Sequence, residues 1–198
     1  MAKVILGVTI SLDGFAEDIN GSVGALYPDL DTLRNTDVLQ ESIHTTGSVV
    51  MAWKEYAMAE DPDWFAGNYE YQVPIFVFTD KEPKKHPKET DKLTFTFVTN
   101  GIKSAILQAK AAAGDKNVTI IGSASTTQQC IRAGLADELH IDIIPVFLKA
   151  GFPPFEDIGN KLIKLERMKA VELPAGRTHL RFRVVKQNLP REKNIRKE

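Results

Sequence analysis

The sequence is poor in cysteine and has no excess of charge of either sign. Its 198 residues include a single cysteine, Cys130, so no disulfide can form within the chain. This usage is typical of a reducing compartment, and we expect a cytoplasmic protein. The formal net charge is −1, which leaves no overall positive field for a polyanion. We therefore expect no nucleic-acid partner.

Long apolar runs are also absent. No stretch approaches the roughly 20 residues that span a bilayer, and the N-terminal MAKVILGVTISLDGF lacks the cleavage site of a signal peptide. We therefore expect no membrane partner. The four histidines do not have metal-ligand spacing, so no metal site is predicted. His140 and His179 alternate with apolar residues on expected strands, which indicates outward-facing or hydrogen-bonded side chains.

Several catalytic and nucleotide-binding motifs are missing. The chain contains no G-x-x-x-x-G-K-[ST], no G-x-G-x-x-G after its first strand and no G-x-S-x-G. These absences argue against a P-loop, the usual dinucleotide-binding fold and an α/β-hydrolase. An H-x-E with P-C-x-x-C is absent as well, so we expect no zinc deaminase domain.

The chain does have an ordinary globular balance, with 43% hydrophobic and 26% charged residues, enough for one core. Strands alternate with helices along most of its length, and two β-rich segments then flank Pro174–Gly176. This order predicts an α/β fold with a mixed, mainly parallel sheet and antiparallel C-terminal strands. We expect one domain over residues 1–186 and a polar, frayed tail over residues 187–198.

Apolar periodicity and glycines at helix ends set the expected elements. Strands are expected at residues 4–10, 48–51, 75–79, 93–99, 118–121 and 138–148. Helices are expected at about residues 31–46, 52–61, 101–113 and 125–133, and an irregular loop at residues 16–30.

The turns that follow the strands carry the candidate functional residues. In an open parallel sheet such strand ends gather along one edge, where ligands bind. Small polar residues after Ile121 stand at an expected helix start, whose N–H groups can bind a phosphate. Ser123 or Ser125 can instead be only an N-cap, which needs no ligand. The turns are at residues 11–14, 51–54, 79–81 and 122–126.

Three stretches together resemble the dihydrofolate reductase superfamily. They are ISLDGF at residues 10–15, IIGSASTTQQCIRAGLADELHIDIIPVFL at residues 120–148 and GFPPFEDI at residues 151–158. The most similar branch is the one named for the reductase domain of bacterial riboflavin biosynthesis, and the similarity covers about residues 3–186. The resemblance implies a three-layer α/β/α domain, commonly a homodimer, that binds NADPH across the strand ends.

The sequence departs from that branch where the cofactor would lie. The branch has Met-Gly-Arg-x-Thr-Tyr where this chain has MAWKEY at residues 51–56, and Gly-Gly where it has Gly122–Ser123. Its later glycine cluster is replaced by FLKAG at residues 147–151. The missing arginine removes the usual partner of a 2′-phosphate. Lys54 or Lys81 can supply its charge, though without the bidentate fork.

The resemblance implies an NADPH-dependent reductase, with NADH as a possible substitute. Its substrate would be a pterin-like or ribosylaminopyrimidine-like heterocycle, as for the 5-amino-6-(5-phosphoribosylamino)uracil reductase of riboflavin biosynthesis. The departures leave a second hypothesis open, a ligand-binding protein that kept the fold and lost hydride transfer.

Site roles follow from the strand ends and from the same resemblance. Asp13 is the candidate catalytic residue, and its alternative role is a turn residue that bonds its own backbone. The candidate substrate-binding residues are Asp13, Gly14, Phe15, Trp64 and Glu138. The candidate cofactor-binding residues are Ala52, Trp53, Lys54, Thr79, Lys81, Gly122, Ser123, Ala124, Ser125 and Thr126.

Overall fold

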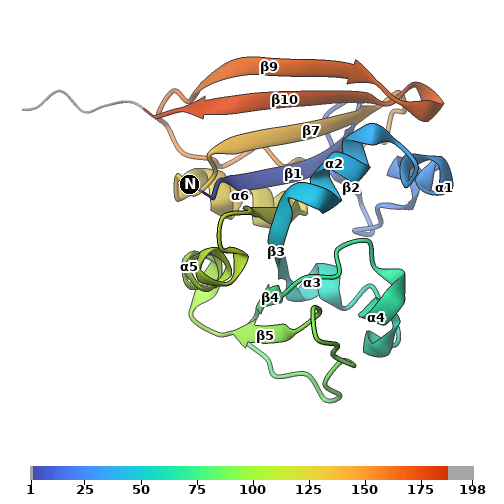
Figure 1. Ribbon diagram of the computed structural model, residues 1–198. Coiled ribbons are helices and arrows are strands. Elements are labelled where there is room, and N and C mark those ends of the chain that lie inside the picture. The colour runs from blue at the N-terminus through green and yellow to red at the C-terminus, as the bar shows by residue number, and fades with distance from the viewer. Residues whose placement is uncertain (1, 187–198) are drawn as a thin grey trace, which may run out of the picture.

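An eight-stranded sheet forms the centre of the computed structural model, which describes residues 2–186 (Figure 1). The strand order is β5-β4-β3-β6-β1-β7-β10-β9. The first six of these strands run parallel, and β10 is antiparallel to both β7 and β9. The strands are β1 (Val4–Ser11), β3 (Thr46–Ala52), β4 (Ile75–Phe78), β5 (Phe95–Val98), β6 (Asn117–Gly122), β7 (Glu138–Ile144), β9 (Lys164–Glu172) and β10 (Thr178–Val185).

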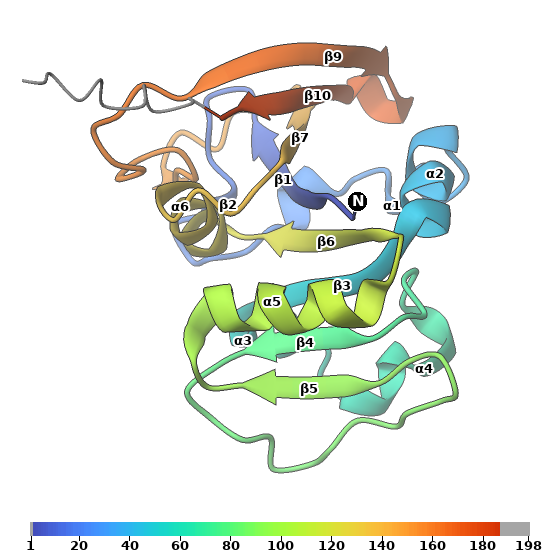
Figure 2. The same ribbon diagram turned by 60° about the vertical axis from the view of Figure 1, so that its left-hand side comes forward.

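Helices cover both faces of the sheet, so the domain has three α/β/α layers. Helix α5 crosses β3 and β4 on one face, and α6 lies on the same side (Figure 2). The other face is covered by α1, α2, α3 and α4 (Figure 1). The bounds are α1 (Leu30–Leu33), α2 (Asp37–Thr45), α3 (Trp53–Tyr56), α4 (Phe65–Asn68), α5 (Gly101–Ala113) and α6 (Ala124–Arg132).

Strand β1 shows how the sequence separates the two layers. Val4, Leu6 and Val8 are at most 5% exposed and pack in the core beneath α5 and α6. The alternate residues Ile5 and Gly7 point to the opposite face, where they line a cavity. Because successive side chains of a strand point to opposite faces, one eight-residue run serves both the core and the candidate site.

The expected elements are largely confirmed, but the helix expected at residues 31–46 is two helices. Thr36 breaks it, because its backbone is extended (φ −79°, ψ 145°) and its hydroxyl accepts the N–H of Leu39 to cap α2. The helix expected at residues 52–61 is confined to α3. The strand expected at residues 138–148 ends at Ile144, ahead of Pro145.

The segment expected to be an irregular loop contains a short strand. Strand β2 (Glu17–Asp18) pairs antiparallel with β8 (Gly151–Phe152) in a separate two-stranded sheet. The tail expected at residues 187–198 lies outside the described residues. Within residues 2–186, no helix is both long and apolar enough to cross a membrane.

Candidate functional site

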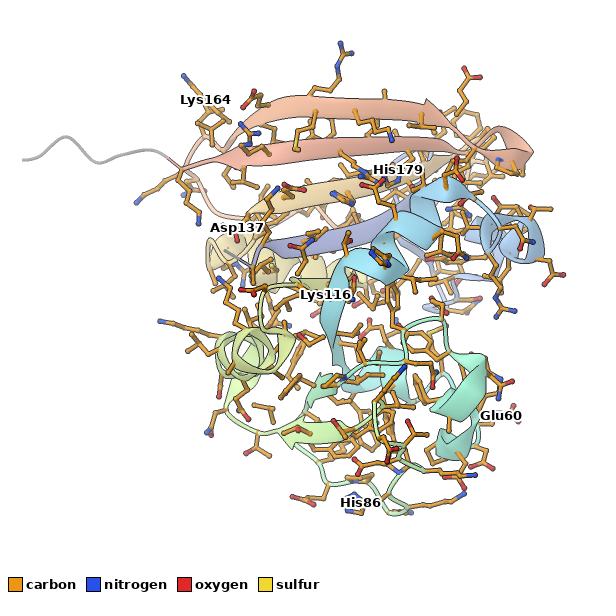
Figure 3. All side chains as sticks on the ribbon, viewed as in Figure 1. Glu60, His86, Lys116, Asp137, Lys164 and His179 are labelled. Atoms are coloured by element: carbon orange, nitrogen blue, oxygen red, sulfur yellow. The ribbon has the colours of Figure 1, made fainter. Side chains whose placement is uncertain are left out.

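A cavity of about 830 Å³ lies between the sheet and the layer formed by α1, α2 and the loop before α4. Its floor comes from the face of β1, β6, β7 and β10 that is turned away from α5 and α6. His179 on β10 and Glu60 beside α4 both line it, and they mark two well-separated parts of its wall (Figure 3). The cavity is therefore large enough for a heterocyclic ligand with a substituent.

Apolar and aromatic side chains form much of the cavity wall. Trp64, as expected from the sequence, is among them, and its ring stands edge-on to that of Phe65, with 5.8 Å between centroids. Phe65 in turn stacks on Tyr56 at 5.6 Å with an interplanar angle of 8°. This packing holds the indole in place in the wall of the cavity.

A network of charged side chains occupies the β7–β10 side of the cavity. Asp142, whose side chain is 21% exposed, receives bonds from His179 Nδ1 at 2.6 Å and Arg177 Nη1 at 3.2 Å. Arg177 is fully buried and also donates twice to Asp29, at 2.9 and 2.6 Å. These bonds to the guanidinium hold the pKa of the Asp29 carboxyl below its usual value.

The same network fixes the tautomer of His179. Arg181 Nε donates to His179 Nε2 at 3.0 Å, and a guanidinium has no acceptor. His179 Nε2 must therefore accept, and the ring proton sits on Nδ1, facing Asp142. Arg181 also donates to both oxygens of Glu41 on α2, at 2.8 and 3.0 Å. These contacts tie α2 to β10 and orient the Asp142 carboxylate.

His140 is a neutral group in the same wall. Burial, together with the nearby charge of Arg181, lowers its pKa to about 4, although Glu138 opposes the shift. Its Nε2 lies 3.3 Å from Glu138 Oε2, and Glu138 also pairs with Lys3 at 2.6 Å. At pH 7 His140 is therefore an uncharged hydrogen-bonding group, and Glu138 itself lies outside the cavity lining.

The start of α6 forms another part of the cavity wall, and side chains of the protein already bind two of its N–H groups. Ser123 caps the helix by accepting the N–H of Thr126 at 3.4 Å. The N–H of Ala124 donates to Glu17 Oε1 at 3.1 Å, and Glu17 Oε2 forms an ion pair with Lys54. Glu17 is only 3% exposed, so its carboxylate is a buried partner of the helix start.

A second carboxylate, Glu55, lines the cavity close to this helix start. Its Oε2 accepts the N–H of Ala52 at 2.9 Å, while Oε1 is buried with no hydrogen-bond partner among residues 2–186. Burial raises the pKa of Glu55, and Ser123 and the nearby N–H groups offset this only in part. Uncharged Glu55 would be a donor, whereas ionised Glu55 would repel an anion.

Gly122 is required by strand packing rather than by a ligand. A Cβ at this position would stand 2.6 Å from the carbonyl oxygen of Gly7 and 2.7 Å from Thr127 Oγ1. The absence of a side chain at Gly122 therefore allows β6 and α6 to approach β1. It does not leave free space for a ligand. Because Glu17 already takes the N–H of Ala124, a dinucleotide diphosphate does not fit the α6 start in this arrangement.

Four of the predicted site residues line the cavity: Lys54, Trp64, Gly122 and Ser123. The others lie outside its lining, namely Asp13, Gly14, Phe15, Ala52, Trp53, Thr79, Lys81, Ala124, Ser125, Thr126 and Glu138. Cavity residues that the sequence did not identify include Glu17, Tyr27, Glu55, His140, Asp142, His179 and Arg181.

Asp13 lies in a turn outside the cavity lining. Its carboxylate accepts from Ser11 Oγ at 2.6 Å and from the N–H groups of Leu148 and Lys149 at 3.1 and 2.7 Å. The bond from Ser11 is the main reason that its pKa is lowered. This arrangement favours the alternative role from the sequence, a turn residue, because an ionised carboxylate with three donors is not poised to give a proton.

The match to a family model covers most of the chain, and the fold recurs in solved structures. The model for the RibD C-terminal domain matches residues 2–178. The uncharacterized protein YyaP of Bacillus subtilis (strain 168) is 28% identical over 174 residues, which cover 81% of this chain and 84% of YyaP.

Two solved structures share the fold at low identity. A protein of Shewanella sp. PV-4, provisionally described as a riboflavin biosynthesis protein, gives a TM-score of 0.70 at 21% identity, over 93% of this chain and 99% of its own. Dihydrofolate reductase from Enterococcus faecalis, complexed with NADP(H) and RAB-propyl, gives a TM-score of 0.58 at 12% identity, over 92% of this chain and 96% of its own. At these identities the structures show the fold alone.

Proposed function

The chain belongs to the family of the RibD C-terminal domain, and we propose on this premise that it is an NADPH-dependent reductase, with NADH as an alternative donor. The family and the reductase-type neighbours support an oxidoreductase of the riboflavin-biosynthesis or dihydrofolate reductase type. We propose a pterin-like or ribosylaminopyrimidine-like heterocycle as the substrate.

The observation that carries this proposal is the Asp142 carboxylate in the wall of a partly aromatic cavity. Each of its oxygens receives one hydrogen bond from the protein, from His179 or from Arg177. A carboxylate oxygen accepts about two hydrogen bonds, so each has capacity for one more donor. An amino group beside a ring N–H, as in a pterin-like heterocycle, supplies two donors side by side. Trp64 adds aromatic surface in another part of the same cavity.

Titration and turnover test the proposal together. Purified protein is titrated with NADPH and NADH while nicotinamide fluorescence is followed, and nicotinamide oxidation is then measured with a panel of pterin and aminopyrimidine substrates. Asp142→Asn should lower kcat/KM about 10²-fold, because one acceptor becomes a donor facing the substrate donors. Nicotinamide affinity should change little.

The control is Asp157→Asn, since Asp157 is exposed and outside this cavity. It removes the same charge and should leave kcat/KM near that of the parent. Turnover by Asp142→Asn at the rate of the parent would overturn the role given to the carboxylate. A parent that binds neither nicotinamide at millimolar concentration would overturn the reductase proposal.

One observation favours the second candidate function, a binding protein without hydride transfer. The α6 start, where a diphosphate was expected, is closed by Glu17 and Lys54. This candidate predicts that a heterocycle binds, as measured by calorimetry, while neither nicotinamide is oxidised in its presence.

The apolar sequences at residues 139–148 and 180–186 predict a two-fold dimer through the strands that they form, and we also propose a homodimer, but through the edge strand β9. Strand β7 lies between β1 and β10, so it has no free edge, whereas β9 ends the sheet. Leu165 and Met168 on β9 are each 42% exposed. Light scattering at micromolar concentration should give twice the mass of one chain. Met168→Glu should lower the measured mass toward that of the monomer.

A further inference from the structure

We propose that Glu17 is a specificity-determining residue of the nicotinamide site: its carboxylate takes the position of an anionic ligand group at α6, and a diphosphate binds there only after Glu17 has left. The inference rests on the proposed function, because it concerns which ligand the α6 start admits. It follows from three contacts of Glu17 and from the way its strand is held.

The first two contacts engage both oxygens of the carboxylate. Oε1 accepts the N–H of Ala124, the first residue of α6, at 3.1 Å, and Oε2 pairs with Lys54. A free N–H at a helix start and a lysine ammonium are the donors that a phosphate oxygen would use. Glu17 therefore presents to the helix a negative charge and oxygen acceptors, as a phosphate group would.

The third contact is made by the backbone. Glu17 pairs with Phe152 in the β2–β8 sheet, and the N–H of the preceding Ala16 donates to the Phe152 carbonyl at 3.0 Å. Gly151 lies so close that a Cβ there would stand 2.0 Å from the Glu17 carbonyl oxygen. The main chain of Glu17 is thus fixed, while its side chain can leave α6 by rotation about its own bonds.

Lys54 can change partners in this exchange. Its side chain is 50% exposed, and its ammonium lies 5.7 Å from the centre of the Phe152 ring, near the surface. A rotated Glu17 would leave Lys54 beside the freed N–H of Ala124. The Lys54 ammonium and the Ala124 N–H would then both be free to bind a diphosphate in place of the carboxylate.

Charge explains why the ligand and Glu17 exclude each other. Two anions about 4 Å apart repel strongly in a partly buried site, so both cannot use the N–H of Ala124. A neutral side chain of the same shape would be displaced more easily. Glu17→Gln keeps the length of the side chain and an oxygen for the Ala124 N–H, and it removes the negative charge.

The experiment compares the affinity for NADPH of four proteins by nicotinamide fluorescence. They are the parent, Glu17→Gln, Glu17→Gln with Lys54→Met, and Glu156→Gln. Glu156 is exposed and outside the cavity lining, so its variant controls for the loss of one negative charge. Thermal unfolding by circular dichroism establishes that each variant is folded. Protection against thermal unfolding by inorganic pyrophosphate gives a second measure that needs neither nicotinamide nor turnover.

Glu17→Gln should bind NADPH about tenfold more tightly than the parent, and Glu156→Gln should match the parent. Adding Lys54→Met should remove most of the gain, because the freed ammonium would no longer hold a phosphate. Pyrophosphate should raise the unfolding temperature of Glu17→Gln more than that of the parent.

Different failures have different meanings. Equal NADPH affinity of the parent and Glu17→Gln, with both binding, overturns the role of Glu17 and leaves the reductase proposal standing. No binding by either protein overturns both. If Glu17→Gln does not fold, Glu17→Ala replaces it with the same expected gain, and an affinity equal to the parent again overturns the role.

Discussion

Ion pairs lie at two sides of the cavity, and the two sets are built differently. At the β7–β10 side, Arg177 is fully buried and holds Asp29 through two bonds and Asp142 through a third. At the α6 side, Glu17 is buried but its partner Lys54 is half exposed and makes a single ion pair. The planar guanidinium of Arg177 holds its partners in a fixed geometry. The ammonium of Lys54 makes one contact at the end of a flexible side chain.

The difference separates permanent from exchangeable interactions. A buried guanidinium cannot lose its partners without leaving a charge out of water, so the Arg177 network has one stable arrangement. A half-exposed lysine remains hydrated when its partner leaves, so the exchange leaves no buried cation without a partner. The β7–β10 side is thus suited to holding Asp142 in a fixed position, and the α6 side to admitting or excluding an anion.

The largest effect on stability should come from replacing the buried Arg177. Arg177→Met should lower the free energy of unfolding by about 3 to 5 kcal/mol, since it leaves Asp29 buried without its cation. Urea unfolding measures this. The matched control is Arg183→Met, because Arg183 pairs with Glu166 at the surface and both are more than half exposed. If Arg177→Met lowers the free energy of unfolding as little as Arg183→Met does, the buried ion pairs of Arg177 stabilise the protein no more than the exposed pair of Arg183.

A second prediction concerns the pH dependence of stability on the β7–β10 side. His140 has a pKa of about 4 in the folded protein and about 6.5 when unfolded, so the unfolded chain takes up the proton first. Stability should therefore fall as the pH drops below 6.5, by at most about 3 kcal/mol by pH 4.

Urea unfolding at pH 7, 6 and 5 tests this before most carboxylates titrate. His140→Gln, which does not titrate, should show a flatter profile over the same range. Equal slopes for the parent and the variant would show that His140 is not the group responsible.

A smaller effect on stability is expected at Asp13, which lies outside the cavity. Asp13→Asn replaces one of the acceptor oxygens that bind Ser11, Leu148 and Lys149, and should lower the unfolding free energy by less than Arg177→Met does. Turnover per folded molecule should remain near that of the parent. A 10²-fold loss of kcat in a variant of unchanged stability would restore the catalytic role first predicted for Asp13.

The fold was largely predictable from the sequence because its determinants are local. Apolar runs mark the strands, and the turn at Pro174–Gly176 separates the two antiparallel strands. The break at Thr36 was missed because a threonine within an amphipathic pattern does not by itself end a helix. The pairing of β2 with β8 was missed because two-residue strands have no periodicity.

The site was less predictable because it depends on register. His140 and Asp142 alternate on β7, as His179 and Arg181 do on β10, and the sequence shows both pairs. Only the antiparallel register, which sets His179 opposite Asp142 and Arg181 opposite His140, places all four on one face. Glu17 gave no signal, since nothing in the sequence relates it to a helix start 107 residues away.

The smallest effect on stability should come from the α6 side. Glu17→Gln removes an ion pair whose lysine is half exposed, and because that lysine stays hydrated, the variant leaves no unpaired charge buried. The amide oxygen can still accept the N–H of Ala124, and an uncharged group costs less to bury than a carboxylate. We therefore expect the unfolding free energy, measured in urea, to change by less than about 1 kcal/mol in either direction. A loss of unfolding free energy above about 3 kcal/mol would show that the contacts of Glu17 stabilise the fold as strongly as those of Arg177. The α6 side could then not exchange its carboxylate for a ligand.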